Sequence, residues 1–196
     1  MRTLFALILI GLTATTGNLS TRAFAAESVT NRPSIAIWRD SGGMPAPGTE
    51  SAGPHLRIAI WNDGRVLYSA DGTNQWSHNL RVGQIDTNRV AALRKAVAET
   101  GVFDLEGTTY LVPDAPRVCV LLDFGDQQQM LYWDEVETPG YGININPQPH
   151  HRRFIRTWKD VNALALAAIP AESQPWTNRF DRPPASWRLK RPIQSR

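Results

Sequence analysis

The architecture is most clearly read from two nearly identical hexads: IAIWRD at residues 35–40 and IAIWND at residues 58–63. Both hexads are short, rich in β-branched and aromatic residues, and bounded by turn-forming residues, which predicts two β-strands. Within each hexad the two isoleucines alternate with an alanine and a tryptophan. Because successive side chains of a strand point to opposite faces, we expect one sheet face to carry the isoleucines and the other to carry Trp38 and Trp61.

Turn signals predict that the other strands pair in hairpins. In Asn62-Asp63-Gly64, the glycine can adopt positive φ without steric cost, so we expect the chain to turn back directly after the second hexad. Val118 to Leu122 are apolar on both faces, which is typical of a central strand, and Gly125-Asp126 suits a two-residue turn after it. The strands predicted in addition to the hexads are residues 65–69, 76–82, 117–124 and 127–134.

Two helices are predicted from apolar residues at three- and four-residue spacing. The first begins after Asp86 as N-cap and runs through Thr100, and Gly101 suits the left-handed position after its end. The second runs from about Pro149 to Ala168 and buries Phe154, Trp158, Val161 and Ala165. We therefore expect an α+β fold, an antiparallel sheet of five to six strands with two amphipathic helices on one face.

The first 25 residues have the pattern of a signal peptide. Arg2 precedes nine apolar residues, and Ala23-Phe24-Ala25 fits the small-x-small pattern that signal peptidase cleaves. Nine apolar residues are too few to span a bilayer, and no cysteine lies at the predicted cleavage site, so a lipoprotein is not expected. We expect cleavage after Ala25 and export to the periplasm or the medium, without a membrane span in the mature chain. An uncleaved membrane tether remains the alternative.

Length and charge divide the remaining chain into a domain and an arm. The chain of 196 residues suits one domain, predicted at residues 26–170, followed by a basic arm at 171–196 that contains proline and tryptophan. The predicted domain holds 13 basic and 16 acidic side chains, whereas the arm holds six basic and two acidic ones. Because the domain is acidic and the chain is exported, nucleic acid is not an expected partner.

The candidate binding residues are aromatic or cationic: Trp38, Trp61, Trp187, Arg188, Lys190 and Arg191. An uncovered Trp38 and Trp61 would offer a surface for sugars or peptides. Alternatively, the arm folds back and covers them with Trp176 or Trp187. The arm mixes cations with apolar residues, which suits an anionic polymer, a membrane surface or a groove on another envelope protein. A solvated tail is the simpler interpretation of the arm.

No pattern of catalytic residues is specific. The pair His150-His151 is adjacent, whereas helical zinc ligands normally lie three or four residues apart, so we predict no metal site and no cofactor. The sequence has no G-x-S-x-G nucleophile motif, and Cys119 lies in the most apolar strand, where a thiol is structural. Carboxylate pairs occur, but such pairs are common on any surface: Asp134 with Glu135 or Glu137, and Asp104 with Glu106.

Three short motifs follow one another along the chain. They are the hairpin Asp63-Gly64-Arg65-Val66-Leu67-Tyr68, the helix exit Gly101-Val102-Phe103-Asp104-Leu105 and the turn Asp114-Ala115-Pro116. In this order they resemble the motifs of a family of small bacterial exported domains of uncharacterised function. The resemblance covers about residues 56–168, although Val102 replaces an aromatic residue and the segment at Ser34–Trp38 and the arm have no counterpart. The resemblance implies a soluble α+β module without assigned catalytic residues.

Together these patterns predict an exported, non-enzymatic binding or interaction module. The alternative is an envelope hydrolase or a metal-dependent enzyme that uses His150, His151 and scattered carboxylates.

Overall fold

The computed structural model describes residues 31–40, 55–71, 79–105, 117–134, 149–177, 184–187 and 189. Seven strands lie within them: β1 (Ile35–Asp40), β2 (His55–Ile60), β3 (Arg65–Ser69), β4 (Leu80–Gln84), β5 (Arg117–Asp123), β6 (Gln128–Asp134) and β7 (Ser173–Pro175). The same residues form two α-helices and two short 3₁₀ helices: α1 (Thr87–Glu99), α2 (Pro149–Ala167), η1 (Val102–Asp104) and η2 (Ala185–Trp187).

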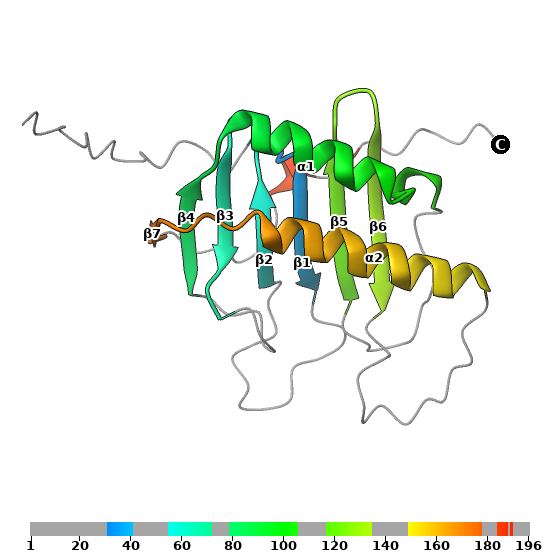
Figure 1. Ribbon diagram of the computed structural model, residues 1–196. Coiled ribbons are helices and arrows are strands. Elements are labelled where there is room, and N and C mark those ends of the chain that lie inside the picture. The colour runs from blue at the N-terminus through cyan, green and yellow to red at the C-terminus, as the bar shows by residue number, and fades with distance from the viewer. Residues whose placement is uncertain are drawn as a thin grey trace, which may run out of the picture.

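The strands form one antiparallel sheet in the order β6-β5-β1-β2-β3-β4-β7, and both α-helices cross the same face of it (Figure 1). β1 lies in the middle because it is apolar on both faces: Ile35 and Ile37 are buried against the helices, and Ala36 and Trp38 are buried on the opposite side. The predicted α+β fold with two helices on one face is therefore confirmed.

The sheet has one or two strands more than the five to six that the sequence predicts. The additional strand β7 pairs with β4 and places Ser173 opposite Gly83. The sequence carries no signal for this strand, because three residues that end in Pro175 show no alternation of apolar and polar side chains. Gly83 makes the close approach possible, since a side chain there would collide with Pro170 and with the carbonyl of Glu172.

The strand predicted at residues 76–82 is also corrected. β4 covers Leu80–Gln84, and Trp76 lies outside the described residues. The shift has a topological cause, because β3 pairs with β4 from Arg65 opposite Gln84 to Ser69 opposite Leu80. The pairing therefore continues to Gln84, next to the turn that contains Gly64, beyond the apolar residues that guided the prediction.

The turn at Gly64 fastens the sheet to the start of α1. Gly64 has φ of 88°, and its N–H donates to the carbonyl of Trp61 at 3.0 Å. The carbonyl of Gly64 accepts from the N–H of Ile85 at 2.8 Å. One residue later, the Asp86 carboxylate accepts from the N–H of Asn88 at 2.7 Å and caps the helix as predicted.

Hydrophobic side chains form two layers, one on each face of the sheet. The helix-side layer joins the four isoleucines of β1 and β2 to residues of both helices, including Val97, Phe154 and Val161. The opposite layer is smaller and contains Trp38, Trp61 and Trp187. None of the described helices combines the length and the hydropathy needed to cross a membrane.

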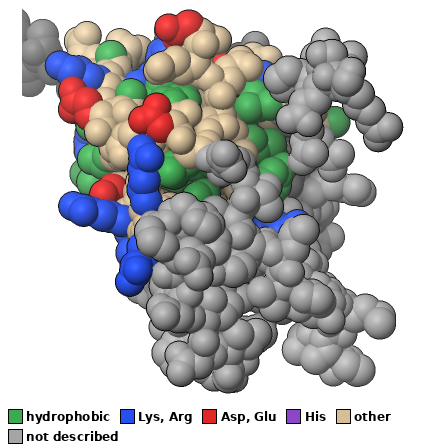
Figure 2. All heavy atoms as spheres, turned by 90° about the vertical axis from the view of Figure 1, so that its right-hand side faces the viewer, with side chains coloured by type: hydrophobic (Ala, Val, Ile, Leu, Met, Phe, Trp, Pro, Cys, Tyr) green, Lys and Arg blue, Asp and Glu red, His purple; other side chains and the backbone are tan. Residues whose placement is uncertain are grey.

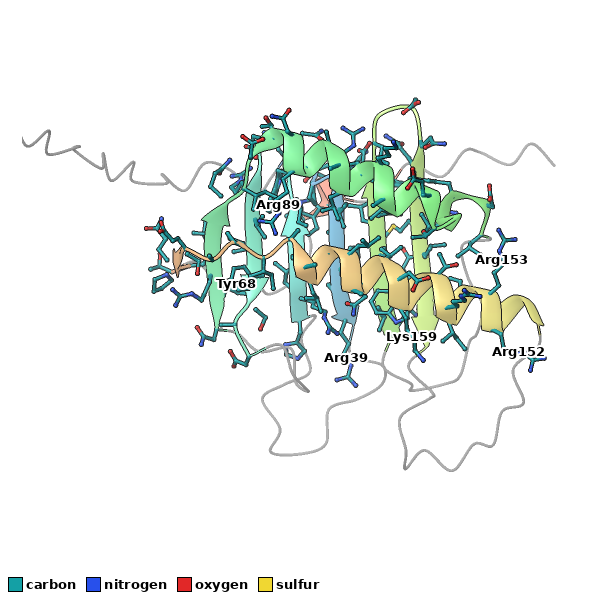
Figure 3. The ribbon with its side chains drawn as sticks, viewed as in Figure 1. Arg39, Tyr68, Arg89, Arg152, Arg153 and Lys159 are labelled. Carbon is teal, nitrogen blue, oxygen red and sulfur yellow. The ribbon has the colours of Figure 1, made fainter. Side chains whose placement is uncertain are left out.

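Polar contacts fix the helices against the sheet and against each other. Arg89 on α1 donates to the carbonyl of Ala167, at the end of α2, at 2.7 Å. Arg94 on α1 links the turn that contains Gly64 to the turn that contains Gly125. It donates to Asn62 Oδ1 at 3.1 Å and to the carbonyl of Phe124 at 2.6 Å. Tyr68, labelled with Arg89 in Figure 3, shares a hydrogen bond of 2.8 Å with the hydroxyl of Ser173.

Candidate functional site

The sheet face opposite the helices, here called the tryptophan face, contains the aromatic residues that the sequence singled out. Trp38 and Trp61 lie on this face, as their alternation with the isoleucines predicts, but they are only 3% and 4% exposed. They are surrounded by aliphatic side chains and Cys119 from the central strands. The other buried residues of this face are Ala36, Leu56, Ala59, Leu67, Leu80, Val82, Cys119 and Leu121.

Trp187 covers the two tryptophans of the sheet. Its ring centroid lies 6.3 Å from that of Trp38 and 5.9 Å from that of Trp61, both in edge-to-face geometry, and the side chain is fully buried. Such pairs contribute about 0.5–1.5 kcal/mol each beyond the area that they bury. Of the two arrangements open from sequence, the structure therefore has the arm folded back onto the sheet, with Trp187 as the covering residue.

Arg32 links the segment that carries Trp187 to the end of β5. Arg32, just before β1, donates through Nε to the carbonyl of Ser186 at 2.9 Å and through Nη1 to Asp123 Oδ2 at 3.0 Å. Close by, the indole N–H of Trp61 donates to the carbonyl of Asn31 at 2.8 Å. The residues before β1, the end of β5 and η2 therefore meet at one end of the tryptophan face.

The Asp123 carboxylate is the anionic centre of this junction. Burial by itself raises the pKa of Asp123, but hydrogen bonds from Gln128, Arg32 and the N–H of Gly125, with the charge of Arg32, outweigh it. The pKa of Asp123 is therefore below its ordinary value. The carboxylate is therefore charged at neutral pH. Its ion pair with Arg32 stabilises the guanidinium where it also donates to the carbonyl of Ser186.

Partly exposed apolar side chains, here called the apolar rim, pack against the buried tryptophans: Met130, Tyr132, Trp176 and Leu189. Met130 and Tyr132 lie on β6, at one edge of the sheet, and the Tyr132 hydroxyl donates to Met130 Sδ at 3.2 Å. Trp176 follows β7 at the other edge of the sheet. Its backbone N–H donates to the carbonyl of Leu80 at 2.8 Å. Figure 2, which views the molecule from the β6 side, shows hydrophobic side chains at the surface.

The remaining predicted residues are not brought together into a site within the described part of the chain. Arg188, Lys190 and Arg191 lie outside it. His150 and His151 belong to the first turn of α2, but their side chains are not described. Among the described residues, no group of three histidine, cysteine or acidic side chains could hold a metal ion, and Cys119 is fully buried.

The structure also shows a group of cations that sequence reasoning did not single out. Arg152, Arg153, Arg156 and Lys159 are all exposed and lie in the first part of α2. Figure 3 labels three of them along this helix, and Figure 2 shows Lys and Arg side chains gathered on one side of the same end of the molecule. The sequence already indicated this group, because the four cations are spaced on the polar side of the predicted helix, opposite Phe154 and Val161.

Known proteins do not identify this fold or this surface. No protein-family model matches the chain, and no curated protein or solved structure matches it. The functional conclusion therefore depends on the chain's own residues.

Proposed function

We propose that the protein is an exported, non-enzymatic interaction module that binds its partner at the apolar rim of the tryptophan face. The signal pattern of residues 1–25 supports export. The observation that carries the binding function is the way in which the tryptophan face is covered. Within the described part of the chain, two long helices cover one side of the sheet, whereas on the other side Trp187 packs over the two tryptophans and partly exposed side chains surround them.

The apolar rim has the composition of a protein-binding surface. Tyrosine, tryptophan and methionine are enriched at the centres of interfaces, because they combine a large contact area with few rotatable bonds or with an adaptable shape. Tyr132, Met130 and Trp176 provide these residue types at the surface, next to a rigid buried layer. A partner that packs on Tyr132 and Met130 would extend the tryptophan layer across β6.

Site-specific photo-crosslinking tests the proposal. A photoreactive phenylalanine analogue replaces Tyr132 or Trp176 in the full chain in its native host, and the matched controls carry it at Ala91 or Ala163, which are exposed on the helices. We expect a discrete adduct from the rim positions and none from the helix positions. The partner identified from the adduct should bind the purified protein, and Tyr132→Arg should weaken that affinity at least about tenfold. Ala163→Arg should leave it unchanged.

Two results would overturn the proposal. The first is crosslinking that occurs only at the helix controls or at no position. The second is turnover of a substrate by the purified protein together with stoichiometric zinc, which would favour the metal-dependent enzyme that uses His150 and His151.

A further inference from the structure

Cations are concentrated in the first part of α2, on its solvent side. Arg152, Arg153, Arg156 and Lys159 fall within the first eleven residues of the helix, and Asp160 follows directly. All five side chains belong to exposed residues. Figure 3 shows Arg152 and Arg153 at the start of α2 and Lys159 farther along the same helix.

The position of these cations is unfavourable for the helix itself. The N-terminus of a helix carries a partial positive charge, so acidic side chains stabilise it and basic ones destabilise it. α1 follows this rule with Asp86 as its N-cap. α2 has no acidic residue in its first turn and has Arg152 there. A bound anion would relieve this repulsion, so the charge distribution points to an anionic ligand.

Three of the cations lie along one line on the helix surface. Arg152, Arg156 and Lys159 are separated by four and three residues, which places them on one face with successive rises of about 6 Å and about 4.5 Å. Arg152 and Arg156 form no ion pair with another described residue, whereas Arg153, farther round the helix, lies 3.5 Å from Asp104. We call these three residues the α2 cation line.

The surroundings of the α2 cation line favour a narrow ligand. Asp160, Asp104 and Glu99 are exposed on the same layer of the molecule, so a broad anionic surface such as a bilayer would also approach these carboxylates. A single polymer chain that lies along α2 would contact the α2 cation line and, beside it, the carboxylate of Asp160. Arginine pairs bidentately with carboxylates, and an acidic polysaccharide presents its carboxylates at regular intervals along one chain.

We propose that the α2 cation line is a docking surface for a linear acidic polysaccharide. This surface lies on the helix layer, away from the apolar rim, and the inference does not depend on the proposed protein partner. It also differs from the expectation that an anionic polymer binds through Arg188, Lys190 and Arg191 of the arm.

Fluorescence anisotropy with end-labelled polygalacturonate oligomers measures this binding at about 50 mM salt, where screening is weak. The protein is the full chain without its predicted signal, residues 26–196. The double variant Arg152→Gln/Arg156→Gln should lower the affinity about fivefold or more, because it removes two charge contacts. Lys95→Gln is the matched control, since Lys95 is an exposed cation on α1 whose side chain is 79% exposed. It should leave the affinity unchanged.

A thermal readout separates lost binding from lost folding. Removing the two charges relieves repulsion at the N-terminus of α2, so the double variant should melt at the same temperature as the wild type or higher. Polygalacturonate should raise the melting temperature of the wild type and not that of the double variant.

Three outcomes would overturn the inference. One is an unchanged affinity in the double variant, and another is a loss seen only with Arg188→Gln/Lys190→Gln/Arg191→Gln. The third is tighter binding of the wild type to phosphatidylglycerol vesicles or duplex DNA than to polygalacturonate at the same salt. None of these outcomes affects crosslinking from Tyr132, so the failure of one proposal can be told from the failure of the other.

Discussion

At the residue scale, Trp187 is the residue of the tryptophan face whose removal we expect to be most costly. Its ring packs against both Trp38 and Trp61, and among the residues that the structure describes it is the largest fully buried side chain. Because protein interiors are close-packed, neighbouring side chains cannot refill a volume of this size by small movements. Its burial therefore makes a short segment far along the chain part of the folded domain.

We expect Trp187→Ala to lower the free energy of unfolding by about 3–5 kcal/mol, the usual cost of removing a buried large aromatic side chain. Urea denaturation monitored by circular dichroism measures the change. Trp176→Ala is the control and should cost clearly less, because Trp176 is partly exposed. Equal losses in the two variants would mean that Trp187 does not occupy the tryptophan face in solution.

The hydrogen bonds at Asp123 predict a pH dependence. Because its folded pKa is lowered, the charged carboxylate contributes stability above its unfolded pKa, near 4, and this contribution is lost as pH falls through the folded pKa. We expect Asp123→Asn to cost about 1 kcal/mol at pH 7 and less at pH 2–3. Denaturation midpoints at the two pH values test this, and a loss independent of pH would contradict it.

At the scale of elements, two glycines with similar backbone conformations provide a matched comparison. Gly64 and Gly125 have φ of 88° and 93°. A Cβ at Gly64 would collide with the carbonyl of Ile85, whereas a Cβ at Gly125 would meet no atom within 4 Å. An alanine would therefore strain the backbone at both sites, but it would also collide with a neighbouring atom at Gly64.

Gly125→Ala should lower the free energy of unfolding by about 1 kcal/mol through strain alone. Gly64→Ala should cost at least about 1–2 kcal/mol more, because the junction between β4 and α1 must also move. Thermal or urea denaturation of both variants measures the difference. If Gly125→Ala lowers the free energy of unfolding as much as Gly64→Ala does, the collision with Ile85 does not contribute to stability.

Elements with a local signal could be predicted from the sequence. α1 is marked by Asp86 at its start and Gly101 after its end, and β1 and β5 are apolar on both faces. β7 could not be predicted, because its pairing depends on the missing side chain of Gly83 and on where α2 ends. The sequence likewise left open whether the arm covers Trp38 and Trp61, since that depends on contacts between residues far apart in the chain.

At the scale of the whole molecule, the two faces of the sheet differ in how they are covered. The helices that cover one face, α1 and α2, come before β5 and after β6, whereas η2, which packs on the other face, follows β7. A truncation after Thr177 therefore removes Trp187 and leaves all seven strands. This variant separates the contribution of the segment from that of the sheet.

We expect the truncated chain to retain the far-ultraviolet circular dichroism of an α+β protein but to unfold at a lower temperature. It should also bind a hydrophobic dye more strongly, because Trp38 and Trp61 become exposed. Differential scanning fluorimetry and dye titration measure both effects. Unchanged stability would show that residues after Thr177 form an independent tail.

The order of elements along the chain also has a consequence for biogenesis. The surface that receives Trp187 is complete once β1 to β6 have formed, but the side chain that covers it is synthesised after every strand and both α-helices. During translation, Trp38 and Trp61 therefore lack their contacts with Trp187 until η2 leaves the ribosome. That interval suits recognition by a holdase chaperone, and under the proposed export it would allow the chain to be threaded through a translocation pore before its packing is complete.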